Sequence, residues 1–176
     1  MPKVDARGQG GLLDVVISPD FARDRMIYWS YAEPREGGNA TSVARGRLSD
    51  DGSRIENVQV IFRALPVYDG DKHFGSRLLL DGQGGLIVTL GERSDVPIRD
   101  SAQADDNHLG KIVRIDPLTG APMGAGIGLP ETHAKGFRNV QAAALDVERV
   151  LRDEYEPMLR MISDCPVPTI ASRRTR

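Results

Sequence analysis

Between residues 12 and 32 the chain reads Leu12-Leu-Asp-Val-Val-Ile-Ser-Pro-Asp-Phe-Ala-Arg-Asp-Arg-Met-Ile-Tyr-Trp-Ser-Tyr-Ala32. Leu12–Ile17 is a short apolar run, and Ser18-Pro19-Asp20 behind it is a typical turn signal. Met26–Ala32 is rich in aromatic residues, which favour β-strands. The stretch therefore predicts two short strands joined by a turn.

The same arrangement recurs further along the chain. Arg77–Leu80, a turn over Asp81–Gly85 and then Leu86–Leu90 repeat the order of strand, turn and strand. Further strands are expected at Ser42–Leu48, Val58–Ala64 and Lys111–Ile115. Repeated units of four short antiparallel strands are typical of β-propeller blades. An ordinary β-meander or sandwich is the alternative interpretation of this pattern.

The composition excludes several classes of protein. The chain has 176 residues, about one domain, with 23 basic and 25 acidic residues and a formal net charge of −2. This balance argues against nucleic-acid binding, and the absence of a long apolar run argues against membrane insertion. A single cysteine, Cys165, excludes an intrachain disulfide and a zinc site built on several thiolates. The first residues have no apolar signal region, so we expect the chain as it stands to be cytoplasmic.

The composition changes near Asp146, which divides the chain into an expected β segment, 1–146, and a tail, 147–176. Val147–Ile162 has apolar residues at spacings near three and four, which predicts a helix that Pro157 breaks or kinks. Cys165–Ala171 is a short apolar run that predicts a strand. A helical tail is therefore expected behind an all-β region.

One histidine has a context that indicates chemistry. His73 lies in a loop that enters the strand Arg77–Leu80, and Glu92 follows the strand Leu86–Leu90. If these strands form a hairpin, their outer ends meet, and Glu92 can reach His73. A carboxylate hydrogen-bonded to an imidazole sets its tautomer and raises its basicity, as a general base requires. The alternative is a solvated pair at the rim of a hairpin.

Other polar segments indicate a function less strongly. Asp69–Asp71 and Asp105–Asn107 supply oxygen ligands of the kind that calcium prefers, but turn or cap roles are favoured. Gly8–Gly11 suits a tight turn better than a phosphate loop, because no dinucleotide fingerprint precedes it. Arg138, followed by Asn139, can bind an anion or a developing oxyanion, or it is an ordinary surface arginine.

Six loop motifs occur together in a recognisable order and spacing. They are Gly8-Gln-Gly-Gly-Leu-Leu-Asp14, Ser18-Pro-Asp-Phe21, His73-Phe-Gly-Ser-Arg77, Thr89-Leu-Gly-Glu92, Asn107-His-Leu-Gly-Lys-Ile-Val-Arg114 and Phe137-Arg-Asn-Val-Gln141. As a set they resemble the soluble PQQ-dependent aldose sugar dehydrogenases of the glucose/sorbosone dehydrogenase family. The resemblance covers about Val4 to Asp146.

The resemblance implies a fold and a reaction. The family fold is a six-bladed β-propeller of four-stranded sheets, so this chain is expected to be a partial β-propeller of about two to three blades. The family is periplasmic and oxidises the C1 hydroxyl of aldose sugars to lactones. PQQ accepts the hydride, and Ca²⁺ activates the cofactor. The family's calcium loop and its clamp on the PQQ carboxylates are not in this chain, so no metal ligands are expected here.

The resemblance also assigns roles to five residues. His73 is similar to the general base that takes the C1 hydroxyl proton, and Glu92 to the carboxylate that orients it. Arg138 is similar to the arginine that stabilises charge on the quinone oxygen, and Asn139 lines the same place. Gln9 resembles a glutamine that contacts cofactor or substrate.

The tail resembles a different family. Leu151–Arg160 and Asp164–Ala171 look like a helix–strand piece of the enoyl-CoA hydratase (crotonase) superfamily, without its oxyanion-hole segments. We expect a quinoprotein sugar dehydrogenase by descent whose activity is impaired or absent in this chain. The alternative is a non-catalytic β-propeller fragment or interaction module. In both cases uncovered blade faces predict self-association or aggregation.

Overall fold

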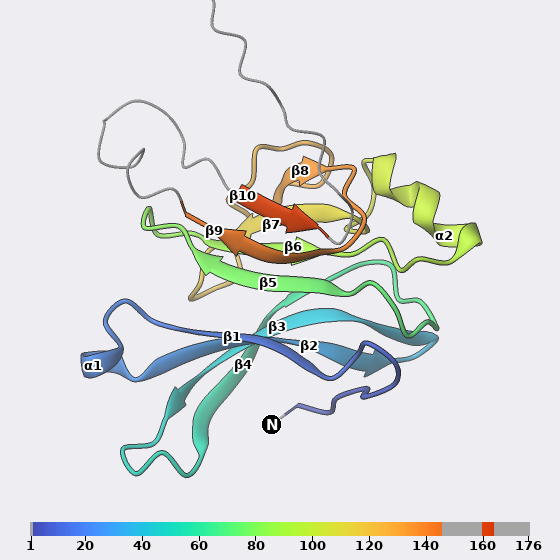
Figure 1. Cartoon of the computed structure of the whole chain (residues 1–176). Helices are drawn as coiled ribbons and strands as arrows, with labels where there is room; N and C mark the ends of the chain where they lie inside the picture. The colour runs from blue at the N-terminus through green and yellow to red at the C-terminus, as the bar shows by residue number, and fades with distance from the viewer. Residues whose placement is uncertain (1, 146–159, 164–176) are drawn as a thin grey trace, which may run out of the picture.

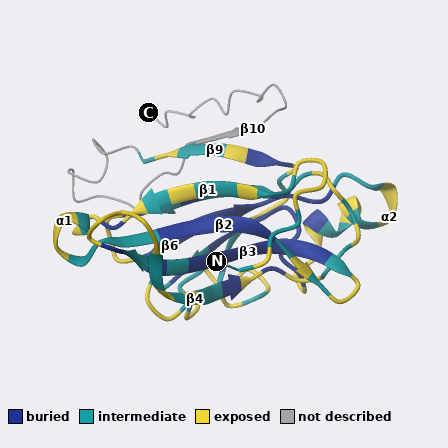
Figure 2. Ribbon diagram, turned by 90° about the horizontal axis from the view of Figure 1, so that it is seen from below, coloured by how far each residue is buried: buried dark blue, intermediate teal, exposed yellow. Residues whose placement is uncertain are grey.

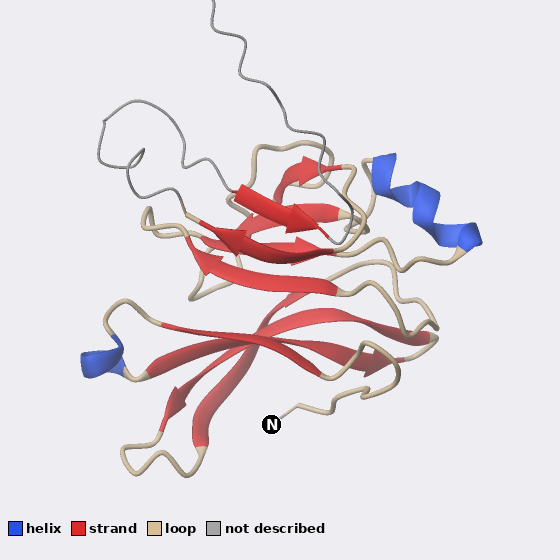
Figure 3. Cartoon of the chain, in the orientation of Figure 1, coloured by secondary structure: helices blue, strands red, loops and turns tan. Residues whose placement is uncertain are grey.

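The computed structural model describes residues 2–145 and 160–163, and these residues form three antiparallel sheets (Figures 1 and 3). The strands of the first sheet are β1 (Leu12–Ile17), β2 (Met26–Arg35), β3 (Gly38–Leu48) and β4 (Ile55–Arg63). Those of the second sheet are β5 (Gly75–Leu80), β6 (Leu86–Leu90), β7 (Lys111–Ile115) and β8 (Thr132–Lys135). The third sheet pairs β9 (Val140–Ala144) with β10 (Arg160–Ser163).

Each four-stranded sheet runs in chain order, β1-β2-β3-β4 and β5-β6-β7-β8, with every neighbouring pair antiparallel. The first strands of the three sheets lie beside one another, with β1 against β5 and β5 against β9 (Figure 1). This is the radial arrangement of blades in a propeller. The expectation of a partial β-propeller is therefore confirmed, and each four-stranded sheet is hereafter called a blade.

Three short helical segments lie outside the sheets (Figure 3). They are α1 (Phe21–Asp24), α2 (Val96–Arg99) and the 3₁₀ helix η1 (Asp100–Gln103). None of the helices in the described residues is long and apolar enough to cross a bilayer. Of the three, α2 and η1 lie in the loop that follows β6 and leads to β7.

The main hydrophobic core lies between the two blades. Tyr28 and Val43 of the first blade share one cluster with Leu78, Val88 and Val113 of the second. Figure 2 shows that β2 and β3 are largely buried, whereas β1 is more exposed. The sheet order explains this, since β2 and β3 are the inner strands of the sheet and β1 is an edge strand.

The blades are also joined by polar contacts between their first strands. The carboxylate of Asp14 in β1 accepts hydrogen bonds from Arg77 Nη1 and from the backbone N–H of Leu78, both at 2.8 Å. A further contact comes from β6, where Thr89 Oγ1 donates to the carbonyl of Val140 in β9 at 2.7 Å. These bonds hold three successive sheets in a fixed order.

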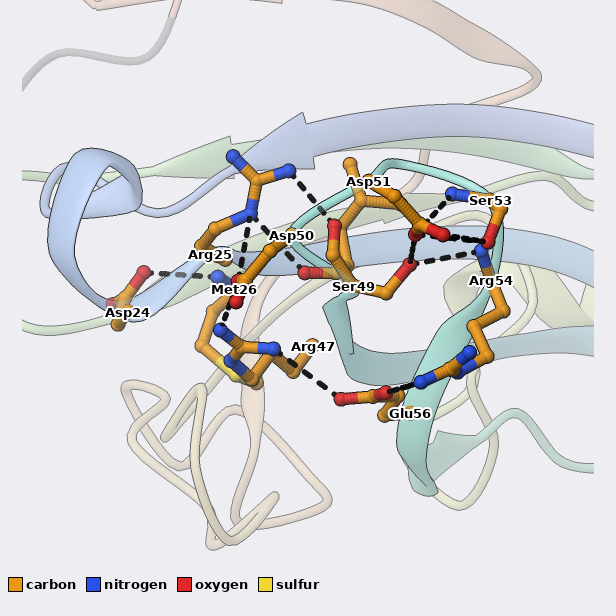
Figure 4. A network of polar contacts seen from close by, with 11 residues as sticks. Asp24, Arg25, Met26, Arg47, Ser49, Asp50, Asp51, Ser53, Arg54 and Glu56 are labelled. Carbon is orange, nitrogen blue, oxygen red and sulfur yellow. Dashed lines mark hydrogen bonds and ion pairs between the residues drawn. The ribbon is translucent and has the colours of Figure 1, made fainter.

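A turn follows β3, and charged residues close it (Figure 4). Asp51 accepts hydrogen bonds from the hydroxyl groups of Ser49 and Ser53. These bonds lower the pKa of Asp51 to about 2. Arg25 donates to the carbonyls of Leu48 and Ser49 and so ties the β1–β2 connection to this turn.

The expected tail requires a correction. The predicted helix Val147–Ile162 is wrong at its end, because residues 160–163 form strand β10, which pairs with β9. Pro157 has no backbone N–H and disfavours a helix that continues past it, whereas the edge of β9 offers backbone partners. Residues 147–159 and Cys165–Ala171 lie outside the described residues, so the rest of the predicted helix and strand stay predictions.

Candidate active site

The hairpin of β5 and β6 positions the two central side chains. His73 precedes β5 and Glu92 follows β6, and the register pairs Gly75 with Leu90. The two side chains therefore meet at the same end of the hairpin, where His73 Nδ1 lies 2.5 Å from Glu92 Oε1. The meeting of these residues, which the hairpin argument predicts, is present in the structure.

The approach of the two loops depends on a glycine. A side chain at Gly91 would bring its Cβ within 1.9 Å of the carbonyl oxygen of His73. His73 itself has a φ of 49°, in the left-handed region that residues other than glycine seldom adopt. Backbone strain at a candidate catalytic residue is common, because the surrounding contacts must hold it in place.

Gln9 supplies one of those contacts. Its side-chain oxygen accepts a hydrogen bond from the His73 backbone N–H at 2.8 Å, and its own N–H donates to the carbonyl of Asp71 at 2.7 Å. The structure therefore places Gln9 against the backbone of the histidine loop.

Glu92 combines a bonded oxygen with a free one. The residue is only 4% exposed, and its Oε2 is buried without a hydrogen-bond partner among the described residues. A carboxylate buried in this way is costly unless something compensates its charge. The guanidinium of Arg138 lies close by, with its Nε 3.9 Å from Oε1.

Arg138 stands at the rim of the site. Its side chain is 64% exposed, and its carbonyl accepts a hydrogen bond from the Glu92 backbone N–H at 2.9 Å. An open pocket of about 280 Å³ lies beside it, lined by Glu92, Arg138 and residues of η1 and its surroundings. A guanidinium in this place can meet an anion or a polar ligand in the pocket.

Asn139 is buried, and its Oδ1 accepts the backbone N–H of Gly75 at 3.0 Å. The structure thus brings together all five residues singled out in the sequence: Gln9, His73, Glu92, Arg138 and Asn139. Gln9 and Asn139 make contacts that hold the loop around His73.

The acidic segments considered for calcium make contacts with the protein itself. Asp69 pairs with Arg7 at 3.0 Å, Asp105 with Lys135 at 2.5 Å, and Asn107 accepts the backbone N–H of Leu109. Within residues 2–145, for which side chains are described, no group of three or more His, Cys, Asp and Glu residues is placed to hold a metal ion.

Sequence reasoning missed two residues beside the site. Arg93 follows Glu92 and is buried, and Asn39 of β3 is buried against it. Burial lowers the pKa of Arg93 to about 10. A charged residue after Gly91-Glu92 is typical of an exposed turn, so no local pattern indicates that Arg93 turns inward. His108 is also buried, and its Nε2 lies 2.7 Å from Glu131 Oε1.

Radial four-stranded blades with a histidine–carboxylate pair at the ends of the strands agree with the family that the loop motifs indicate. The family model described as Glucose / Sorbosone dehydrogenase matches residues 1–158. The chain belongs to this family.

Two relatives show the sequence similarity to this family. Aldose sugar dehydrogenase YliI of Escherichia coli (strain K12) is 47% identical over 116 residues, which are 65% of this chain and 30% of the relative. Uncharacterized protein slr1608 of Synechocystis sp. (strain ATCC 27184 / PCC 6803 / Kazusa) is 36% identical over 157 residues, 80% of this chain and 37% of the relative. The chain thus spans about a third of these relatives.

Solved structures share the fold. The soluble aldose sugar dehydrogenase of Escherichia coli, in its apo form, superposes with a TM-score of 0.75 at 39% identity, over 84% of this chain and 44% of that one. The PQQ-bound aldose sugar dehydrogenase of Streptomyces coelicolor superposes with a TM-score of 0.70 at 29% identity, over 84% and 42%.

Proposed function

We propose that this chain carries the proton-accepting part of a PQQ-dependent aldose dehydrogenase site. The reaction is the oxidation of the C1 hydroxyl of an aldose to a lactone. The observation that carries the proposal is the short contact of 2.5 Å between His73 and the buried Glu92. A buried carboxylate on one ring nitrogen is the arrangement that prepares the other nitrogen to accept a proton.

One feature of the pocket fits the cofactor. Arg138 presents an exposed guanidinium beside an open pocket, where it can pair with an anionic group. When bound, PQQ supplies the acceptor for the hydride that leaves C1. We assign no calcium ligand within the described residues.

The chain's own residues then perform the following tasks. With its Nδ1–H donated to Glu92, neutral His73 carries its lone pair on Nε2, which takes the proton of the C1 hydroxyl. Glu92 stabilises the resulting imidazolium, as the carboxylate of a catalytic triad does. Arg138, exposed beside the pocket, would supply a fixed positive charge to PQQ bound there. Gln9 and Asn139 hold the backbone on either side of His73.

The test is sugar-dependent dye reduction after titration with PQQ and Ca²⁺. His73→Ala should lower the rate by about 10²-fold or more, the usual contribution of a general base. His133→Ala is the matched control, because His133 lies on β8 and lines a different pocket. Wild-type activity in His73→Ala would exclude the proposed base.

A second candidate function is a non-catalytic interaction module. It is favoured by the outer face of the first blade, where Leu12, Val15 and Ile17 are 62%, 60% and 56% exposed. We propose that this face drives self-association. Failure of the wild-type chain to bind PQQ at all would support this second function over the first.

A further inference from the structure

The segment that leads to His73 is held from the inside by one buried cation. Arg93 is 3% exposed, and its Nε donates to the carbonyl of Lys72 at 3.0 Å. Its Nη2 donates to the carbonyl of Gly70 at 2.7 Å. One planar group therefore fixes two carbonyls of the four residues that end at His73.

The same guanidinium contacts the residue after His73. Its central carbon lies 4.1 Å from the centroid of the Phe74 ring, which is within the range of a cation–π interaction. Arg93 thus touches the residues on both sides of His73 and is covalently joined to Glu92. No other described side chain is shown to touch both neighbours of the histidine while adjoining its carboxylate partner.

Arg93 also joins this unit to the first blade. Its Nη2 donates to Asn39 Oδ1 at 2.6 Å, and Asn39 Nδ2 donates to the carbonyl of Gly70 at 2.8 Å. Asn39 belongs to β3, whereas Arg93 follows β6. The position of the histidine loop is therefore set from both blades.

The chemistry of the contacts distinguishes Arg93 from an ordinary ion pair. The hydrogen bonds described for its guanidinium all go to neutral amide oxygens: those of Lys72, Gly70 and Asn39. Burying a cation with no carboxylate in contact lowers the stability of the folded state. We therefore infer that Arg93 serves to fix the geometry of the backbone that it contacts. A forked donor suits several carbonyls at once, which the single ammonium of lysine does not.

We propose that Arg93 is the positioning residue of the His73–Glu92 pair. It holds residues 70–74 in the conformation that gives His73 its left-handed backbone and points its Nδ1 at Glu92. This inference rests on the proposed function for its catalytic meaning, but the geometry it describes can be tested without turnover.

The test is NMR of the histidine rings in the full chain, comparing wild type with Arg93→Lys and Arg93→Gln. In wild type we expect a downfield Nδ1–H signal from the His73–Glu92 hydrogen bond. In Arg93→Lys this signal should disappear, because His73 Nδ1 no longer lies within hydrogen-bond distance of Glu92. His133 serves as an internal reference for correct folding. An unchanged Nδ1–H signal of His73 in the folded variants would overturn the proposal.

A milder variant keeps the test decisive if both arginine variants fail to fold. Phe74→Leu removes the ring beneath the guanidinium but keeps an apolar side chain, and it should shift the His73 Nδ1–H signal upfield without abolishing it. No shift in a folded Phe74→Leu, together with unfolded arginine variants, would assign Arg93 to stability and reject the positioning role.

The result of this test can be distinguished from the result of the test of the proposed function. If the Nδ1–H signal is lost in Arg93→Lys but the wild type has no dehydrogenase activity, the positioning role stands and the proposed function fails. If the wild type is active, Arg93→Lys should lower kcat about 10-fold or more, with a smaller effect on KM, because a misplaced base slows the chemical step.

Discussion

At the scale of single residues, the two histidine–carboxylate pairs, His73–Glu92 and His108–Glu131, have different roles. Glu92 keeps one oxygen free beside a pocket, whereas both ring nitrogens of His108 are occupied. His108 Nδ1 accepts the backbone N–H of Leu65 at 2.9 Å, so the neutral ring donates from Nε2 to Glu131 at 2.7 Å. His108 therefore joins the end of the first blade to the second and has no lone pair available for catalysis.

Burial lowers the pKa of His108, and this makes stability depend on pH. Below about pH 6.5 the unfolded chain binds a proton at this residue that the folded chain resists. The free energy of unfolding should therefore fall by up to about 1.4 kcal/mol for each pH unit between 6.5 and the lowered pKa.

Urea unfolding at pH 7.5 and pH 5.5 measures this effect. The drop in the unfolding free energy should be smaller in His108→Gln than in wild type and in the control His133→Gln. An equal drop in all three proteins would show that other groups cause the pH dependence.

At the scale of elements, each blade has a turn between its first two strands, and an aspartate lies in each turn. The two aspartates differ in burial and in the contacts that they make. Asp20 is exposed and pairs with Arg23 at the surface. Asp81 is 1% exposed, and its Oδ1 accepts the backbone N–H groups of Gln83 and Gly85. Its Oδ2 accepts from Arg114 of β7 at 2.6 Å. One side chain thus closes the β5–β6 turn and ties it to the next strand.

Replacement of the buried turn acid should therefore be far more damaging than replacement of the exposed one. Asp81→Ala should lower the free energy of unfolding by about 3–5 kcal/mol, because it leaves Arg114 and two N–H groups unpaired. Asp20→Ala, the matched control, should cost less than about 1 kcal/mol. Urea unfolding measures both, and equal losses would contradict this account of the turn.

At the scale of the whole molecule, the two faces of the first blade differ in what packs against them. One face packs on the second blade, and the other gathers Trp29, Tyr31 and Ala44 into a separate cluster. An open groove of about 350 Å³, lined partly by Leu12 and Val15, lies over that cluster. The second blade differs, because β9 lies against β5 on its far side.

The exposed apolar face should make the protein self-associate. Light scattering coupled to size exclusion should find oligomers or aggregates for the wild type, and Val15→Lys with Ile17→Lys should shift the population towards monomer. Arg23→Glu with Asp20→Lys, which changes charges at an exposed turn, is the control. A wild-type chain that elutes as a monomer and unfolds cooperatively on heating would refute this prediction.

Local patterns in the sequence determined much of this protein. Turn residues and short apolar runs predicted most strands of the two blades, since strand and turn formation depend on residues close in the chain. The meeting of His73 with Glu92 followed from a hairpin of adjacent strands. The short strands β8 and β9 were missed, because Thr132–Lys135 and Val140–Ala144 carry no strong alternation of apolar and polar residues.

Only the tertiary structure decided which charged residues turn inward. The residues next to Arg93 and Asp81 in the sequence are typical of exposed turns, yet both side chains are buried. Their partners lie on other strands and on another blade, such as Asn39 for Arg93. A charged side chain can be buried only where polar groups from distant parts of the chain surround it. Residue spacing along the sequence does not predict which distant groups come together.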